Sequence, residues 1–219
     1  MFFKKKKNKI FCISMQRTGT TSVGEFFKKN GFKVADWPMS FKNKWSYHWE
    51  QGDFETIFNS EDFKNNQVFE DDPWWLPEFY KVLYHRFPDT KFILLTRDED
   101  AWFKSMLSHS KGQNPGNTKR HCKVYRREED FYQLISDDQL KDYDEKSIDN
   151  LLSLRGYEDH YKTLYSIRNK EIMEFFNKNA PESLFVAKLE DPNKWQKLGE
   201  FFNIKISADL EVHANKSNK

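Results

Sequence analysis

The sequence predicts an α/β fold in which a central parallel sheet lies between two layers of helices. Short apolar runs alternate with amphipathic segments along most of the chain, as expected when helices join parallel strands. Residues 91–96 contain a continuous apolar run, which is typical of a strand covered on both faces. The chain has 219 residues, including 21 Phe, 9 Tyr and 7 Trp, and is therefore long enough for a full hydrophobic core.

The first expected elements are a strand at 10–14 and a helix at 20–30, joined by a polar loop. A strand, a loop with glycine and a helix N-terminus form an anion-binding site, because backbone N–H groups and the positive end of the helix dipole point at one spot. Side chains add hydroxyl donors and one fixed positive charge: Arg17, Thr18, Thr20, Thr21 and Ser22. The first 25 residues therefore predict a site for phosphate or a related anion.

The later elements are expected in the same alternating order. A short strand at 32–35 precedes an aromatic segment at 37–66, which contains a possible short helix at 53–60. The remaining elements are a strand at 67–70, a helix at 76–86, a strand at 91–96, helices at 99–110, 128–141 and near 147–178, a strand at 183–188, and a helix that Asp191 caps, that Pro192 begins and that ends near Phe202. We expect an exposed loop at 111–123 and one domain over 1–219, with its core at 9–204 and flexible ends.

The loop after the first strand is not a Walker A loop, G-x-x-x-x-G-K-[ST]. Ser14 stands at the position of the first glycine, Thr20 at that of the lysine, and the positive residue is Arg17. The loop resembles instead the 5′-phosphosulfate-binding loop of sulfotransferases, typically Pro-[Lys/Arg]-[Ser/Thr]-Gly-Thr-Thr. Here that motif is Gln16-Arg17-Thr18-Gly19-Thr20-Thr21, with Gln for Pro and Arg for the commoner Lys.

A second segment strengthens this resemblance. Arg97 stands at the carboxyl end of the strand at 91–96, and Ser105 follows eight residues later in the next helix. Sulfotransferases carry the same Arg-x7-Ser pair, which holds the 3′-phosphate of the cofactor PAPS (3′-phosphoadenosine 5′-phosphosulfate), and Arg offers a forked donor for phosphate oxygens. The alternative is that Arg97 caps a helix or pairs with Asp98 or Asp100, and that Ser105 is an ordinary helix residue.

The order of the other motifs also resembles one branch of these proteins. Asp71-Asp72-Pro73 matches an Asp-x-Pro motif that precedes a helix and then Phe87-Pro88-Asp89-Thr90-Lys91. The segments 157–161 and 189–202 are similar to the family's His-containing helix and closing strand–helix unit. The resemblance covers residues 9–204 and implies a P-loop-like three-layer α/β/α fold.

The resemblance implies a sulfotransferase that moves the sulfuryl group of PAPS to a hydroxyl or amine, leaving PAP, by in-line transfer without a metal. It implies that Arg97 and Ser105 bind the 3′-phosphate. Arg17 would stabilise the bridging and sulfuryl oxygens by charge alone, since a guanidinium group does not give up its proton in proteins. The implied cofactor-binding residues are Arg17, Thr18, Gly19, Thr20, Thr21, Ser22, Arg97 and Ser105.

Transfer to a hydroxyl also requires a base. Asp71 is the first candidate because it follows a strand end at the Asp-x-Pro position; alternatively, Asp71 or Asp72 caps the following helix. His160 lies where the family has a histidine, and the alternative there is a packed or surface side chain. Glu70 and His48 are weaker candidates.

Composition limits the partners. The net charge of +2 argues against a dedicated nucleic-acid binder. No apolar stretch approaches about 18 residues, so no membrane span is expected. Cys12 and Cys122 lie far apart without metal-ligand spacing, which indicates a reduced, cytoplasmic protein. The lysines at 4–7 predict a solvated end or a weak attraction to acidic membranes.

The acceptor and the oligomeric state are not identified by any pattern, so small-molecule, carbohydrate and lipid acceptors stay open. The basic segment 111–127 is either a solvated loop or a cover for the cofactor that also attracts anionic acceptors. The aromatic residues at 37–49 and Trp74-Trp75 either form a ring-stacking wall or pack in the core.

Two other functions stay open at this point. One is a nucleotide or nucleoside kinase on a degenerate P-loop, which would need Mg²⁺ and a loop lysine that this sequence lacks. The other is a non-catalytic nucleotide- or phosphate-binding module, which the departures at Gln16 and Arg17 favour.

Overall fold

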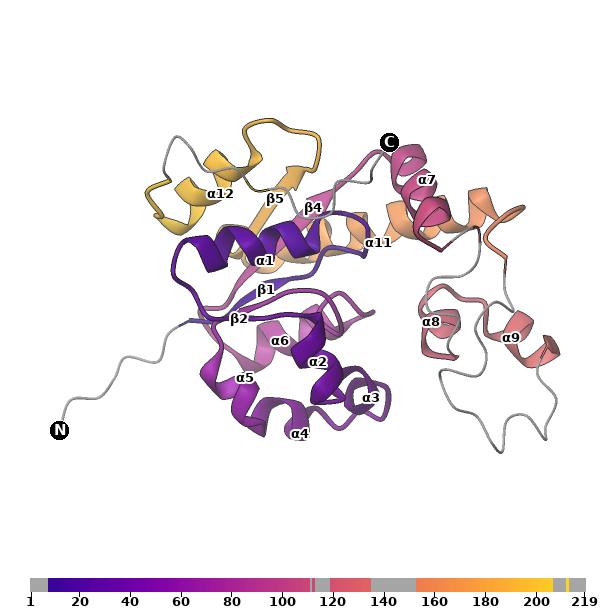
Figure 1. Cartoon of the computed structure of the whole chain (residues 1–219), viewed down its shortest axis with the longest axis horizontal. Helices are drawn as coiled ribbons and strands as arrows, with labels where there is room; N and C mark the ends of the chain where they lie inside the picture. Colours follow the sequence, from indigo (N-terminus) through magenta and orange to yellow (C-terminus); the bar gives the residue numbers. More distant parts are fainter. Residues whose placement is uncertain (1–7, 111, 113–118, 135–152, 207–211, 213–219) are drawn as a thin grey trace. The chain divides into compact units, whose positions relative to one another are not determined.

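The computed structural model describes residues 8–110, 112, 119–134, 153–206 and 212. They fall into two compact units, the first of the described residues within 1–97 and 172–219 and the second of those within 98–171 (Figure 1). Each unit is described by itself below. The single domain expected over 1–219 stays a prediction.

The first unit contains a five-stranded sheet with the order β2-β3-β1-β4-β5. Its strands are β1 (Ile10–Cys12), β2 (Val34–Ala35), β3 (Val68–Phe69), β4 (Lys91–Thr96) and β5 (Leu184–Lys188). All neighbouring pairs are parallel, which confirms the expected parallel sheet. The carboxyl ends of all five strands therefore meet at one edge, where ligands bind in open α/β sheets.

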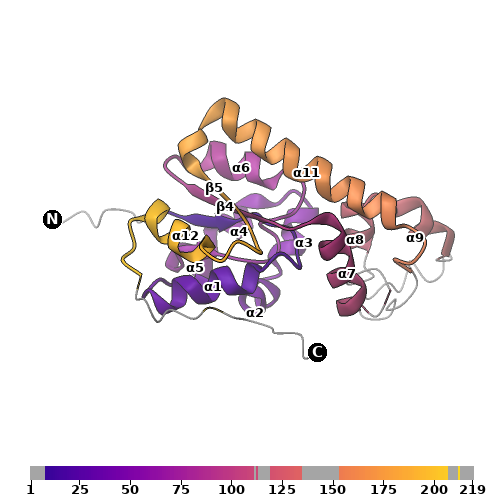
Figure 2. The same cartoon turned by 90° about the horizontal axis from the view of Figure 1, so that it is seen from above.

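Helices cover both faces of this sheet. Alternate strand residues point to opposite sides, and both sides carry apolar side chains that need cover from water. Phe11 and Leu94 belong to one hydrophobic cluster, which α6 (Phe79–Arg86) and the end of α11 (Glu158–Asn179) cover. Cys12 and Leu95 belong to a second cluster, beneath α1 (Thr20–Lys29) and α12 (Lys194–Phe202). Figure 2 shows these two helix layers on either side of the sheet, which confirms the three-layer α/β/α architecture.

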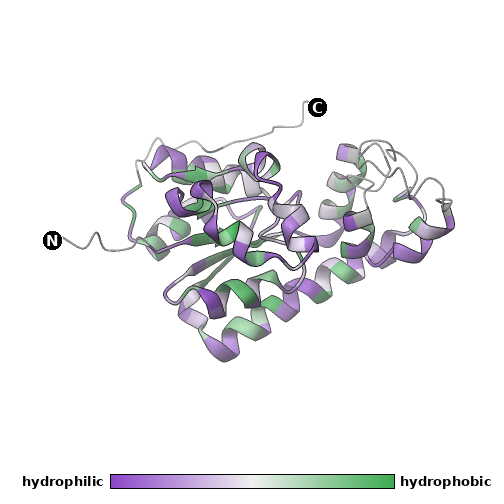
Figure 3. Cartoon of the chain, turned by 90° about the horizontal axis from the view of Figure 1, so that it is seen from below, coloured by the Kyte–Doolittle hydropathy of each residue, from purple (hydrophilic) through white to green (hydrophobic). Residues whose placement is uncertain are grey.

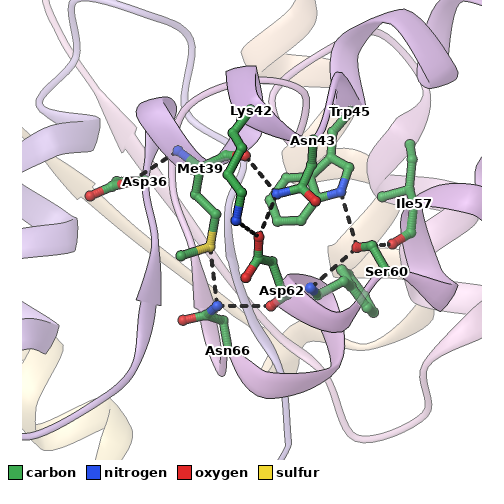
Figure 4. Close-up of polar contacts among 10 residues, drawn as sticks. Asp36, Met39, Lys42, Asn43, Trp45, Ile57, Ser60, Asp62 and Asn66 are labelled. Carbon is green, nitrogen blue, oxygen red and sulfur yellow. Dashed lines mark hydrogen bonds and ion pairs between the residues drawn. The ribbon is translucent and has the colours of Figure 1, made fainter.

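The aromatic segment between β2 and β3 folds into four short helices. They are α2 (Trp37–Lys42), α3 (Trp45–Glu50), α4 (Phe54–Asn59) and α5 (Glu61–Asn65). Side chains join them (Figure 4): Nδ2 of Asn43, which follows α2, donates to Oδ2 of Asp62 in α5 at 2.7 Å, and the hydroxyl of Ser60 accepts from the indole Nε1 of Trp45 at 3.1 Å. Asp36 caps α2 by accepting from the N–H of Met39 at 3.3 Å. Trp45 itself is buried in the core.

The second unit contains α7 (Glu99–Ser110), α8 (Lys119–Val124), α9 (Glu128–Leu134) and the first part of α11. Trp102 of α7 stacks on Tyr165 of α11, with ring centroids 4.4 Å apart. Arg127 is buried between α8 and α9, donates to Asp130 at 2.6 Å, and lies 3.8 Å from the ring centroid of Tyr157.

The prediction of an exposed loop at 111–123 is wrong for residues 119–123, which the structure describes as helical. Helix α8 begins at Lys119, and Arg120, His121 and Cys122 are buried. Burial, together with the charge of Arg120, lowers the pKa of His121 to about 3. The basic composition of the segment indicated solvent exposure, but its aromatic and sulfur-bearing residues pack inward instead.

Three helices begin later than expected. Residues 71–78 form turns that include a cis Asp72–Pro73 bond, so α6 begins at Phe79. The helix expected from 147 begins only at Glu158, after Gly156 at φ 86°. Helix α12 begins at Lys194 rather than at Pro192. The predictions for 135–141, for 147–152 and for the last dozen residues except Val212 lie outside the described residues.

Helix α11, the longest helix, carries hydrophobic and hydrophilic residues in alternation along its length (Figure 3). Such a helix buries one face and exposes the other. Within the part of the chain that the structure describes, no helix combines the length and the apolar character needed to cross a membrane.

Candidate active site

The loop between β1 and α1 is held by contacts that its sequence dictates. The buried hydroxyl of Ser14 accepts from the N–H of Leu95 at 2.7 Å and donates to the carbonyl of Ile93 at 3.3 Å. Ser14 therefore joins the start of the loop to β4. Thr18 is also buried, and its hydroxyl donates to the carbonyl of Met15, so it stabilises the turn from within.

Gly19 allows the loop to turn into α1. Its φ is 92°, in the left-handed region that glycine adopts without steric cost. A Cβ atom at this position would lie only 2.7 Å from Cδ1 of Leu189, which follows β5. Glycine meets both requirements without strain, and Arg17, two residues earlier, is also left-handed, at φ 67°.

The N-terminus of α1 faces the same loop edge. The helix begins at Thr20, no side chain caps its N-terminus, and its first turn contains no acidic residue. The first N–H groups of a helix lack partners within the helix and carry the positive end of its dipole. The loop and this helix end therefore form the anion-binding arrangement that the sequence predicts.

Two arginines meet at this edge of the sheet. Arg97 follows Thr96, the last residue of β4, and the pKa of Arg17 is lowered by its own burial and then by the positive charge of Arg97. Two guanidinium groups that repel each other gain most from an anion between them. Arg97 also donates from Nε to Oε1 of Glu190 at 3.0 Å.

Two acidic residues follow β3 beside the loop. Burial raises the pKa of Glu70 to about 8, with a further contribution from the charge of Asp71. The pKa of Asp71 is also raised by burial, while hydrogen bonds from the N–H of Asp72, at 2.8 Å, and from the Thr20 side chain oppose the rise. The Thr20 contact joins Asp71 directly to the start of α1.

Asp71 and Asp72 do not cap the next helix, because α6 begins at Phe79 with Glu78 as its N-cap. That alternative for the Asp-x-Pro motif is therefore wrong.

His48, one of the weaker base candidates, contacts Asp53 at 3.1 Å. Glu70 packs against α1: a Cβ atom at Gly24 would lie 3.0 Å from Cγ of Glu70.

The first unit thus brings most of the predicted site residues to one place in the fold. The loop, the start of α1, Arg97 and Asp71 all lie at the carboxyl ends of neighbouring parallel strands. Arg97 pairs with Glu190, and the carboxylate of its sequence neighbour Asp98 accepts from the N–H of Ala101 at 3.0 Å. Asp100 pairs with Lys162 at 2.5 Å.

Ser105 and His160 belong to the second unit, and their roles stay predictions. Ser105 lies half-buried on α7. His160 contacts the carbonyl of Tyr125 through Nε2 at 2.7 Å. Because a carbonyl only accepts, Nε2 carries the proton, and only Nδ1 is left to accept one.

Sequence reasoning missed Leu189 and Glu190 as parts of the site. Both were placed only in a closing strand–helix unit. They lie at the site because β5 pairs with β4 in a register that sets Lys188 beside Thr96. The only local signal for them was the end of the apolar run at 183–188, beside the carboxyl end of another strand.

A scan against protein-family models matches residues 9–219 to the sulfotransferase domain family. The match includes the loop, both arginines, the acidic residues after β3 and the turn after β5. A search of curated proteins finds no match. Since the family model covers nearly the whole chain, this protein belongs to the sulfotransferase domain family.

Proposed function

We propose that the protein is a PAPS-dependent sulfotransferase that acts on a hydroxyl or amine acceptor. Membership of the family supports sulfotransfer in general. The observation that carries the choice of donor is the repulsion between Arg17 and Arg97 beside the N-terminus of α1. PAPS has a 5′-phosphosulfate and a 3′-phosphate, so it would bring negative charge to both arginines.

The residues present fit this cofactor. Thr21, Ser22 and the backbone N–H groups of the loop would hold the 5′-phosphate, while Thr20 offers its backbone because its hydroxyl contacts Asp71. Arg97 would hold the 3′-phosphate, with Ser105 as its predicted partner. Thr18 and Gly19 would shape the loop rather than contact the ligand through side chains.

PAPS supplies the sulfuryl group, and PAP leaves with the electron pair of the broken S–O bond. Arg17 would stabilise the oxygens on which negative charge develops and so lower the activation barrier of sulfuryl transfer. This effect is stronger in a partly buried site than in water. It would act by charge alone, because guanidinium does not give up its proton in proteins.

Asp71 would take the proton that the acceptor oxygen loses as its new bond to sulfur forms. A base works best when its pKa lies near the working pH, and burial moves the pKa of Asp71 upward in that direction. Its contact with Thr20 places it at the loop. His160 remains a second predicted proton carrier, through Nδ1.

The acceptor is proposed only as a small molecule, carbohydrate or lipid with a hydroxyl or amine. Trp45, Trp74 and Trp75 are buried and therefore serve the core. A ring-stacking wall would use exposed residues instead: Trp37 and Phe41 of α2 are exposed and stack with centroids 5.4 Å apart. α2 begins just after the carboxyl end of β2, at the same edge of the sheet as the loop.

The two cysteines fit a reducing compartment, and a cytoplasmic location stays a prediction. Both cysteines lie in the part of the chain that the structure describes, and Cys12 and Cys122 are buried thiols outside any disulfide. Burial raises the pKa of Cys12 to about 12 and that of Cys122 to about 11. A raised pKa favours the protonated thiol, which is less reactive than the thiolate.

Calorimetric titration with PAP in EDTA tests the proposal. We expect a Kd in the micromolar range or below, and Arg97→Ala should weaken it by about ten-fold or more. Arg86→Ala is a matched control, because Arg86 pairs with Glu55 at 2.9 Å on the surface; it should bind PAP as the wild type does.

Failure to bind PAP, with binding of ATP–Mg²⁺ instead, would overturn the proposal in favour of a kinase. PAP binding without sulfuryl transfer to any acceptor in a broad screen would point to a non-catalytic nucleotide-binding module.

A further inference from the structure

The ends of β4 and β5 bring two residues together that are far apart in the sequence. Thr96 pairs with Lys188 in the parallel ladder, and the N–H of Leu189 donates to the carbonyl of Thr96 at 2.7 Å, which extends the ladder by one bond. The two strands lie side by side in Figure 1. The residues that follow this last bonded pair along the two chains are Arg97, after Thr96, and Glu190, after Leu189.

Arg97 and Glu190 form an ion pair at this point. Nε of Arg97 donates to Oε1 of Glu190 at 3.0 Å, and the two side chains are 27% and 48% exposed. An ion pair this exposed stabilises a fold only slightly, because water and salt screen it. Stability alone is therefore a weak reason for a carboxylate beside the arginine that is proposed to bind phosphate.

The turn that carries Glu190 is itself fixed on both sides. Leu189 packs closely against Gly19 of the loop: a Cβ atom there would lie 2.7 Å from Cδ1 of Leu189. Asp191 accepts from the N–H of Asn193 at 2.8 Å and pairs with Lys197 at 2.6 Å. Glu190 thus projects from a turn that is tied to the anion-binding loop and to the start of α12.

A guanidinium group is planar, with five N–H donors in a fixed fork. Holding its Nε fixes the plane of the group, so the direction of its terminal nitrogens no longer depends on a flexible side chain. A phosphate that is bound through two parallel N–H donors requires such an orientation. A carboxylate would oppose phosphate binding by charge, so its benefit must come from orientation.

We propose that Glu190 is a positioning residue that orients the guanidinium of Arg97 and thereby makes the protein select nucleotides that carry a 3′-phosphate. The inference rests on the proposed function, because it assumes that Arg97 binds that phosphate. It adds the residue that sets nucleotide selectivity at this end of the site.

The test compares two nucleotides that differ only in the 3′-phosphate: PAP and adenosine 5′-monophosphate. Calorimetry gives the Kd of each for wild type, Glu190→Ala and Glu190→Gln, and the selectivity is the ratio of the two values. In Glu190→Ala we expect the selectivity to fall by about ten-fold or more, with the affinity for the monophosphate within about three-fold of wild type. Glu190→Gln keeps an oxygen acceptor for Nε, so it should retain selectivity within about three-fold.

Glu55→Ala is the matched control, since it removes another exposed carboxylate that pairs with an arginine, Arg86, and has no part in the turn that carries Glu190. It should leave the selectivity unchanged, whatever it does to stability. The inference is overturned if Glu190→Ala retains the wild-type selectivity, if Glu190→Gln loses as much as Glu190→Ala, or if Glu55→Ala lowers the selectivity equally. Wild-type protein that binds neither nucleotide, or both equally, would instead overturn the proposed function.

Discussion

The hydroxyl of Ser14 accepts a hydrogen bond from the N–H of Leu95 at 2.7 Å and so joins the anion-binding loop to the neighbouring strand. Both residues are buried, so neither group has water as an alternative partner. This contact gives a structural reason for serine at the position where a Walker A loop begins with glycine. It also ties the position of the loop to the strand that ends at Arg97.

Replacing Ser14 with Ala should lower the free energy of unfolding by about 1–3 kcal/mol, because it leaves the buried N–H of Leu95 without its acceptor. Urea denaturation measures the change. Ser166→Ala is the control, because Ser166 donates to Glu99 at an exposed position; it should cost less than about 0.5 kcal/mol. Equal stability of the two variants would contradict the structural role of Ser14.

Replacing Gly19 with Ala should weaken PAP binding by at least about ten-fold, because the new Cβ would displace Leu189 and with it the loop. Gly31→Ala is the control: Gly31 has a similar left-handed φ of 80°, but nothing lies within 4 Å of its Cβ position. Both variants bear the cost of a positive φ, so Gly31→Ala shows what that strain costs at the other end of α1, away from the loop. Unchanged PAP affinity in Gly19→Ala would be incompatible with this loop geometry.

Glu70 should make the protein less stable as the pH rises. Its pKa is raised from 4.5 to about 8, so the folded chain keeps a proton that the unfolded chain has already released, and the free energy of unfolding falls between these two values. Glu70→Gln cannot ionise and should lack this part of the fall. Urea denaturation at about pH 5 and about pH 8 should therefore show a Glu70→Gln variant that gains stability relative to wild type at the higher pH.

The exposed Glu55, which pairs with Arg86, offers the control for this measurement. Glu55→Gln should follow the wild-type pH dependence. A Glu70→Gln variant with the same pH dependence as wild type would show that Glu70 ionises freely in the folded state.

Replacing Asp71 with Asn should reduce sulfuryl transfer by about 10²–10⁴-fold, the usual contribution of a general base, while PAP binding stays within about three-fold of wild type. Asn tolerates the left-handed backbone that Asp71 adopts at φ 70°, so the turn should persist. The measurement is PAP release from PAPS with the best acceptor from a screen of alcohols, sugars and amines. Asp53→Asn, at an exposed helix N-cap, is the control and should keep wild-type turnover. Wild-type turnover in Asp71→Asn would exclude Asp71 as the base.

Local patterns predicted the parts of the fold that depend on local chemistry. The strand Lys91–Thr96 and the helix Glu99–Ser110 have the expected bounds, because an apolar run and an acidic first turn mark them in the sequence. Three of the four short helices between β2 and β3 begin at side-chain caps, Asp36, Asp53 and Ser60, and a periodic pattern of five or six residues does not reveal such short helices.

The residues of the candidate site also fall into two groups, those that local sequence predicts and those that only the fold brings together. The loop with Arg17 and Gly19 could be found from sequence, since one short segment supplies the turn, the charge and the helix end. Glu190 could not, because its contact with Arg97 depends on the register of two strands that are distant in the chain. The burial of His121 was missed for a related reason: its neighbours in the fold are set by packing within α7 to α11, and composition alone indicated a solvated loop.

The order of strands has a consequence for how the protein is made. Four neighbouring strands, β2-β3-β1-β4, are complete once Arg97 has left the ribosome, but the edge strand β5 is synthesised much later. Until then, β4 presents a row of unpaired N–H and C=O groups together with apolar side chains, the features that promote aggregation of a nascent chain. The last strand therefore protects this edge and also brings Glu190 beside Arg97, so the orientation proposed for the arginine becomes available only once β5 has joined the sheet.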